Sequence, residues 1–275
     1  MIQLGIFAKT FSGDRLDTIF RKVKAQGISV AHFNFSCVGL PSLPTEIDDA
    51  TIQQIQQTAQ RHKLEIPSIS ATFNMISPNT QEVGKGITAF AAIARVAPLL
   101  GAKTITLCTG SRNQQDKWAW HPGNATTEAW QEMLTVFEKI LAVAEKHDLW
   151  LGVEPEAANV VSDAQKARQL IEELQSDRIK IVLDPANLFE KGTFDKLRPV
   201  LAEAIDLLHP QLIMAHAKDR KADGTFCAAG QGVVDFGYFI EKLTQAGFDG
   251  PLVLHGLAEA EVPAAAHFLQ QKLLN

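Results

Sequence analysis

Short apolar runs alternate along the chain with longer stretches in which apolar and polar residues follow helical spacing. The apolar runs are typical of strands that are buried on both faces, as in a parallel sheet. They predict strands at Ile2–Ala8, Ser29–Phe35, within Leu64–Phe73, and at Lys103–Cys108, Trp150–Glu154, Ile179–Asp184, Leu212–His216 and Leu252–His255. The stretches between them predict helices at Asp14–Gln26, Asp48–His62, most of Asn79–Leu100, Thr126–His147, Asp163–Leu174, most of Phe194–Leu208, Phe236–Ala246 and Val262–Leu273.

This alternation of strands and helices continues through the whole chain without a linker or a change in composition. Eight strand–helix units within about 250 residues are the expected size of a closed (β/α)8 TIM barrel. The alternative is a doubly wound open sheet, which usually carries a glycine-rich first turn. The first turn here reads AKTFSGD and lacks GxGxxG. We therefore predict one TIM-barrel domain over residues 1–275.

Composition narrows the class of protein further. The hydrophobic fraction of 46% and the charged fraction of 21% are ordinary for a globular enzyme. The net charge of −5 lacks the basic surface that a nucleic-acid-binding protein needs. The cysteines at 37, 108 and 227 show no CxxC spacing, and no stretch is long and apolar enough for a membrane span. We expect a cytoplasmic protein that binds neither nucleic acid nor membrane.

Four side chains that can ligate a metal stand at the ends of four successive predicted strands. Glu154 and Asp184 are each followed by a proline, which cannot donate to a strand ladder and so marks the strand end. His216 and His255 end the next two apolar runs. Each residue alone could simply belong to a polar rim, but four at one level favour a metal site on the catalytic face of a barrel. Mixed nitrogen and oxygen ligands suit Mn²⁺, Zn²⁺, Co²⁺ or Fe²⁺ better than Ca²⁺.

The loop over residues 110–125 clusters Arg112, Trp118, Trp120 and His121. Loops of this length in a compact domain are often lids or binding loops. Arg112 is a candidate fork for a phosphate or carboxylate, and Trp118 and His121 are candidates for contact with substrate. The tryptophans could alternatively pack against a neighbouring subunit of a homo-oligomer.

A second long loop is predicted at Lys218–Val234. Its Gly230 and Gly232 could bind an anion through backbone N–H groups, although a tight turn that leads to Asp235 is the favoured interpretation. Five further histidines are interpreted as structural, namely His32, His62, His147, His209 and His267.

Taken together, the motifs GVEPE, LDPANL, AHAKD, GQGVVDF and FDGPLVLHG resemble the sugar phosphate isomerase/epimerase family of xylose-isomerase-like TIM barrels. The resemblance covers essentially the whole chain. It implies one divalent metal ion (Mn, Zn, Co or Mg) held by a strand-five Glu, a strand-six Asp, a strand-seven His and a strand-eight Glu. Glu154, Asp184 and His216 match the first three positions.

The chain departs from this family at two positions. His255 stands where members carry the strand-eight Glu, and Asn187, a candidate for contact with substrate, stands where many epimerases carry a His. Epimerases of the family use the two glutamates as opposed proton donor and acceptor. His255 could ligate the metal when neutral or act as an acid when protonated. Glu156 or Glu259 could take the place of the absent carboxylate.

The resemblance implies an enzyme that removes a proton next to a carbonyl and passes through an enediolate. Glu154 is the expected base, and Lys218 is expected to bind a substrate oxygen or to hold Glu154. We expect an isomerase or epimerase of a small sugar, sugar acid or sugar phosphate. A dehydratase of a keto-polyol and a non-catalytic sugar-binding barrel remain open alternatives. A nuclease like the apurinic endonucleases is disfavoured, because those carry more metal-ligating histidines and a basic surface.

Overall fold

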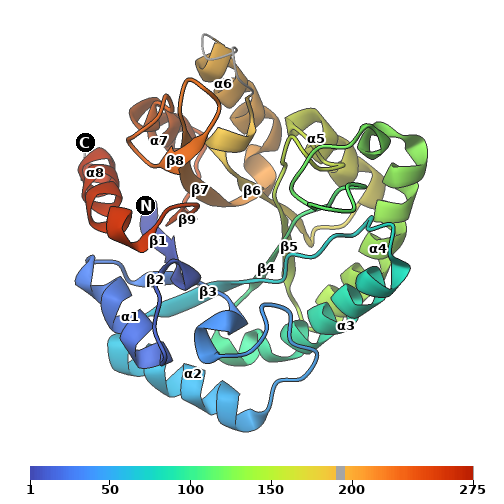
Figure 1. Ribbon diagram of the computed structural model, residues 1–275. Coiled ribbons are helices and arrows are strands. Elements are labelled where there is room, and N and C mark those ends of the chain that lie inside the picture. The colour runs from blue at the N-terminus through green and yellow to red at the C-terminus, as the bar shows by residue number, and fades with distance from the viewer. Residues whose placement is uncertain (190–195, 275) are drawn as a thin grey trace.

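The computed structural model describes residues 1–189 and 196–274, in which eight parallel strands close into a barrel (Figure 1). The strands are β1 (Gln3–Phe7), β2 (Val30–Phe33), β3 (Glu65–Ser70), β4 (Thr104–Leu107), β5 (Trp150–Val153), β6 (Ile179–Leu183), β7 (Leu212–Arg220) and β9 (Pro251–Leu254). Each strand pairs with the next around the ring, and the pairings of β1 with β9 and of β6 with β7 complete the closure. The predicted TIM barrel is confirmed.

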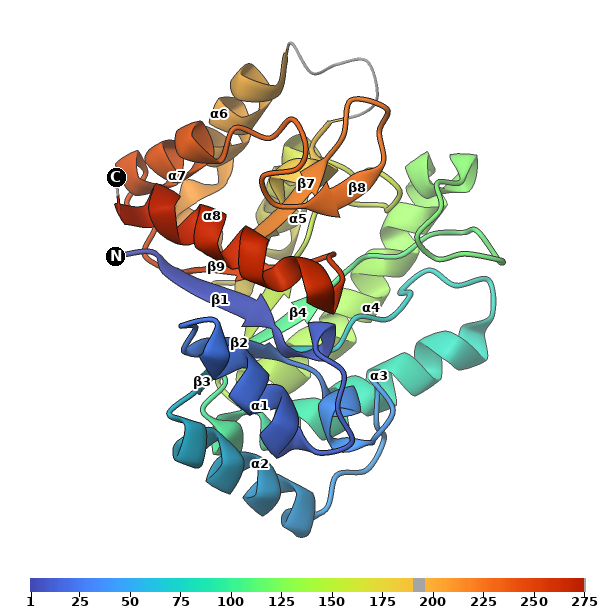
Figure 2. The ribbon, with the colours of Figure 1, turned by 60° about the vertical axis from the view of Figure 1, so that its left-hand side comes forward.

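Eight helices in the described part of the chain surround this barrel (Figures 1 and 2). They are α1 (Leu16–Ala25), α2 (Asp49–His62), α3 (Thr80–Val96), α4 (Thr127–Lys146), α5 (Ala164–Leu174), α6 (Leu197–Leu208), α7 (Phe236–Gln245) and α8 (Val262–Leu274). Both views place the two termini near each other. Among the described residues, none of these helices has the length and apolar content needed to cross a membrane.

Several helices begin one residue later than predicted, because the predicted first residue is the N-cap. Asp48, Asn79, Thr126 and Asp163 each accept a hydrogen bond from a backbone N–H of the first turn. The start predicted for the sixth helix, Phe194, lies outside the described residues.

The strands are buried on both faces, which explains why the sequence shows apolar runs instead of alternation. In β5 the barrel wall leaves little room for a side chain at Gly152. A Cβ at Gly152 would lie 3.0 Å from Val182 Cγ2 and 3.1 Å from Thr104 Cγ2, so the side chains of β4 and β6 close over this glycine. β5 therefore fits between its neighbours and carries Glu154 to the barrel rim.

The structure corrects the prediction of a loop after His216. β7 continues to Arg220 and pairs antiparallel with the short strand β8 (Phe226–Ala228). The buried carboxylate of Asp219 holds the segment after β8, because it accepts hydrogen bonds from the backbone N–H groups of Gly230, Gly232 and Val234. A Cβ at Gly232 would lie 2.3 Å from Asp219 Oδ1, which requires glycine there. The anion bound by these N–H groups is thus the chain's own carboxylate.

Candidate functional site

A central cavity of about 630 Å³ opens at the carboxyl ends of the barrel strands. This size is within the range of small-molecule sites. TIM-barrel enzymes carry their active sites at this end of the barrel. The side chains that line it include Phe7, Lys9, His32, Asn34, Ser70, Thr106, Lys117, Trp118, Glu154, Glu156, Asn187, His216, Lys218, Arg220 and His255.

Three of the four predicted metal ligands form one cluster beside this cavity. Glu154, Asp184 and His216 each offer a ligand atom, and these atoms lie within 4.8 Å of one another. Strand pairing explains the placement. Leu183 pairs with Ala215 in the β6–β7 ladder, so the residues that follow them, Asp184 and His216, emerge side by side.

A chain of hydrogen bonds fixes the orientation of the cluster. Lys218 Nζ lies 3.1 Å from Asp184 Oδ2 and donates to Asn187 Oδ1 at 2.9 Å. Asn187 Nδ2 donates in turn to Glu154 Oε1 at 2.9 Å, and His216 Nδ1 lies 3.2 Å from the same oxygen. Lys218 therefore holds Glu154 through Asn187. Asn187 also lines the cavity, so its predicted contact with substrate stays a prediction.

The charges of the cluster shift the pKa values in opposite directions. Burial would raise the pKa of Glu154, but the charge and hydrogen bond of His216, together with Lys218, hold that pKa below its ordinary value. Burial would lower the pKa of His216, but Glu154 and Asp184 raise it above its ordinary value. The pKa of Lys218 is raised in the same way, because Asp184 and Glu154 outweigh burial. The cluster thus favours an ionised glutamate that faces positive charge.

The residues present fit a divalent cation. Within the described residues, His216 Nε2 and His255 Nδ1 are buried and have no hydrogen-bond partner. Buried polar atoms are rarely left unsatisfied, so these two nitrogens on adjacent rings are suited to ligate an ion. Two carboxylates with imidazole nitrogen form a donor set suited to Mn²⁺, Zn²⁺, Co²⁺ or Mg²⁺.

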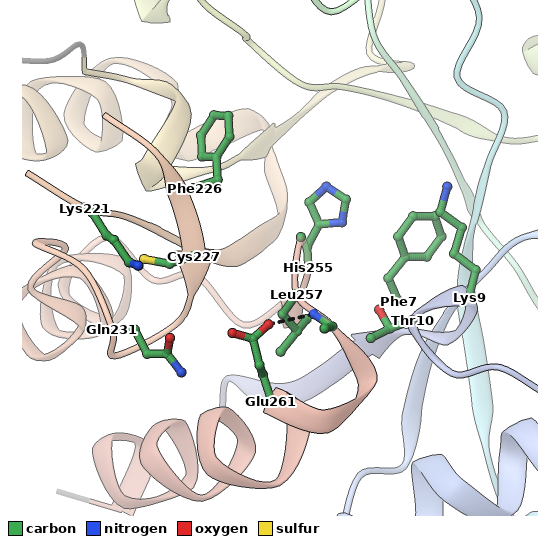
Figure 3. A pocket seen from close by; sticks show the side chains of 12 residues that line it. Phe7, Lys9, Thr10, Lys221, Phe226, Cys227, Gln231, His255, Leu257 and Glu261 are labelled. Carbon is green, nitrogen blue, oxygen red and sulfur yellow. Dashed lines mark hydrogen bonds between the residues drawn. The ribbon is translucent and has the colours of Figure 1, made fainter. Parts of the chain in front are cut away.

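His255 lies beside the three-residue cluster and not within it. It follows β9 directly, and its ring centroid is 4.6 Å from that of His216 and 5.5 Å from that of Phe7. Figure 3 shows its ring between Phe226 and Phe7, where a side cavity of about 470 Å³ adjoins the central one. Burial, followed by the charge of His216, lowers the pKa of His255 well below its ordinary value. A neutral imidazole results, and its role as a fourth ligand stays a prediction.

The backbone after His255 also supports the position of Lys218. Gly256 has a φ of 68°, and a Cβ there would lie 2.7 Å from Lys218 Cδ. A larger residue would therefore push the lysine stem away from Asp184. The glycine lets the chain turn away from β9 while the buried lysine passes close to it.

His32, which the sequence suggested was structural, lines the central cavity. Its Nδ1 lies 2.8 Å from Ser68 Oγ and its Nε2 lies 3.2 Å from Thr106 Oγ1. Burial, followed by the charge of His216, lowers the pKa of His32 to about 3. No alternation of apolar and polar residues marks this inward position in the sequence, because all of β2 is buried.

The long loop before α4 is divided between two sites. Trp118 lines the central cavity, but Arg112 and His121 line a separate surface hollow. Arg112 Nη2 pairs with Glu132 Oε1 at 2.6 Å, and its backbone N–H donates to Asn124 Oδ1 at 2.7 Å. These contacts turn Arg112 toward α4, away from the place expected for a substrate fork.

Glu156 and Glu259 were considered as replacements for the missing strand-eight glutamate, and only Glu156 lines the cavity. Glu156 lines the cavity, and burial followed by the charge of Glu154 raises its pKa to about 8. Glu259 is tied elsewhere, since it accepts hydrogen bonds from Ser12 Oγ at 2.7 Å and from Lys22 Nζ at 2.6 Å.

Comparison with known proteins agrees with this geometry. Residues 13–272 match the model of the xylose isomerase-like TIM barrel family, and the chain belongs to that family. A search of curated proteins finds no match. Among solved structures, 3-keto-D-glucoside 4-epimerase from E. coli is similar, with 15% identity, a TM-score of 0.77 and 100% of both chains covered.

Two further solved structures have the same fold. An L-ribulose 3-epimerase is 16% identical over 100% of this chain and 95% of its own, with a TM-score of 0.76. A probable 3-DHS dehydratase from Bacillus anthracis is 15% identical over 98% of this chain and 99% of its own, also with a TM-score of 0.76. At these identities the similarity establishes the fold.

Proposed function

We propose that the protein is a metal-dependent enzyme that isomerises or epimerises a small sugar, sugar acid or sugar phosphate through an enediolate. The observation that carries this proposal is the cluster of Glu154, Asp184 and His216 beside a cavity of about 630 Å³. The names of the similar structures, which include two sugar epimerases, support it.

The residues of the cluster have separate roles in metal binding and in proton transfer. A divalent ion, when bound by Glu154, Asp184 and His216, supplies positive charge that stabilises the negative charge developing on substrate oxygens. Glu154 is ionised and accepts the proton from the carbon next to the carbonyl. The hydrogen bonds from Asn187 and His216 orient its carboxylate but also lower its basicity. The proton transfer therefore depends on stabilisation of the enediolate.

Glu156 is the proton donor in this proposal, and Glu154 is the base. Its raised pKa of about 8 keeps the carboxyl protonated near neutral pH, so it can return a proton to the intermediate. Isomerisation needs one base only, whereas epimerisation needs a donor on the opposite side of the carbon. The same intermediate can expel a neighbouring hydroxyl if Glu156 protonates it. The similarity to a probable dehydratase makes this lyase reaction the second candidate.

Metal analysis followed by a proton-exchange screen tests the proposal. The purified protein is analysed for bound metal and then incubated with sugars, sugar acids and sugar phosphates in D₂O. We expect NMR to show deuterium next to the carbonyl of at least one compound, and we expect EDTA to abolish this exchange. The product distinguishes an isomerase, an epimerase and a dehydratase. Binding of a carbohydrate without exchange and without metal would instead indicate a non-catalytic sugar-binding barrel.

A further inference from the structure

Two lysines on the lining of the central cavity form no salt bridge within the described residues, although the charge of Lys117 opposes the rise in the pKa of Glu156. Lys9 lies just beyond β1, and Lys117 lies in the loop between β4 and α4. Within the described residues, neither lysine forms a salt bridge or a hydrogen bond. Asp116, the nearest acidic residue to Lys117 in the sequence, accepts a hydrogen bond from the backbone N–H of Trp118.

Both ammonium groups are instead held over aromatic rings. Lys9 Nζ is 4.8 Å from the centroid of the Phe7 ring, and Lys117 Nζ is 5.0 Å from that of the Trp118 ring. Figure 3 shows Lys9 beside Phe7, next to the ring of His255. A cation–π contact restricts the position of an ammonium group without neutralising it. The two charges are thus positioned but remain available to a ligand.

The two lysines influence each other electrostatically. Burial, followed by the charge of Lys117, lowers the pKa of Lys9. The other cations of the cavity are already engaged, since Lys218 pairs with Asp184 and the Arg220 guanidinium donates to the carbonyl oxygen of Gly224. An anion bound between Lys9 and Lys117 would relieve their repulsion and gain two attractions. The chain carries a net charge of −5, so this positive charge is a local feature.

We propose that Lys9 and Lys117 form an anion subsite that binds the carboxylate or phosphate group of an acidic carbohydrate. The cavity of about 630 Å³ allows one small molecule to reach both this subsite and the Glu154 cluster. The inference rests on the proposed function only where it calls the bound anion a substrate. The binding preference for an anion follows from the lysines themselves and selects acidic substrates over neutral sugars.

Three non-reactive probes test this preference on the metal-loaded protein: sorbitol, D-gluconate and sorbitol 6-phosphate. They share a six-carbon polyol skeleton and lack an aldehyde or ketone group, so binding is measured without turnover. Calorimetry at low ionic strength is expected to show that at least one of the two anions binds about tenfold or more tightly than sorbitol. The preferred anion distinguishes a carboxylate from a phosphate ligand. Added salt should weaken anion binding and leave sorbitol binding nearly unchanged.

Substitutions assign the preference to the two lysines. The double variant Lys9→Gln and Lys117→Gln should bring anion affinity to within about twofold of sorbitol affinity, while each Lys→Arg replacement keeps the preference. Lys139→Gln, on the exposed face of α4, is the matched control and should change nothing. Equal affinity of all three probes, no binding of any probe, or an undiminished preference in the double variant would overturn the proposal. Failure of the proposed function would appear as no deuterium exchange, which leaves these binding results intact.

Discussion

Two walls of the central cavity differ in how their polar groups are satisfied. On the wall formed by the ends of β5, β6 and β7, Glu154, Asn187, Lys218 and Asp184 form an unbroken chain of hydrogen bonds and ion pairs. This network exists before any substrate arrives. It fixes the side chains in one arrangement, as a metal centre requires.

The adjoining wall, formed by the ends of β9, β1 and β2, is mainly aromatic and cationic. The Phe7 ring lies 4.5 Å from that of His32 and 5.5 Å from that of His255, and Lys9 Nζ stands over the same phenylalanine. His255 Nδ1 and the ammonium of Lys9 lack partners among the described residues. The first wall thus holds Glu154, Asn187 and Lys218 through its own contacts and leaves His216 Nε2 open, whereas the second leaves His255 Nδ1 and the Lys9 ammonium open to a ligand.

Removing the carboxylate of the networked wall should give the largest effect. We expect Glu154→Gln to lower turnover about 10³-fold, because the amide cannot accept a proton. Metal affinity should fall much less, since one amide oxygen remains as a ligand. Steady-state kinetics and calorimetric metal titration separate the two effects, with the exposed Glu138→Gln on α4 as the control. Retained turnover would show that Glu154 is not the base.

The next largest effect separates the two carboxylates that could replace the missing glutamate. Glu156→Gln should lower turnover about 10²-fold, because Glu156 lines the cavity. Glu259→Gln should leave turnover within about twofold of the unmodified protein, because Glu259 is bound to Lys22 and Ser12. Kinetics of both variants under identical metal loading provide the measurement. The reverse order of effects would contradict this assignment.

A smaller effect is expected on the aromatic wall. His255→Gln should weaken metal binding about tenfold if the unpartnered Nδ1 faces the ion, and His255→Glu should retain the metal. His32→Gln is the matched control, since both ring nitrogens of His32 already have hydroxyl partners. Calorimetric titration of the demetallated variants measures the difference. Equal losses in His255→Gln and His32→Gln would exclude His255 as a ligand.

The smallest effect concerns stability, away from the cavity. Hydrogen bonds from Lys22 and Ser12 lower the pKa of Glu259 from 4.5 to about 2. Because the folded-state pKa is depressed, this stabilisation is present above about pH 4.5 and disappears as the pH falls toward 2. Glu259→Gln should cost less than about 1 kcal/mol at pH 7, since both side chains of the Lys22–Glu259 pair keep about a third of their surface in contact with solvent. Denaturant unfolding should show the difference vanishing near pH 2, and a constant difference would contradict the pKa shift.

The fold and the core of the candidate site follow from local sequence features. Short apolar runs specify strands buried on both faces, and a proline after Glu154 and after Asp184 ends each strand at its polar residue. In a parallel barrel the carboxyl ends of all strands meet at one rim, so strand-end residues come together once the fold is known. Lys9 lies just past the end of β1, so the same rule places it at the rim beside the cavity.

Only the tertiary structure decided which way the loop side chains point. Arg112 and Lys117 belong to one loop, yet Asn124 and Glu132 turn Arg112 away, while Lys117 lines the cavity. The strand extension beyond His216 was likewise invisible, because its stability depends on Asp219 and backbone N–H groups more than ten residues away. Apolar periodicity specifies a position along a strand, but loop orientation depends on hydrogen bonds between residues distant in the sequence. Those contacts exist only after the barrel has closed.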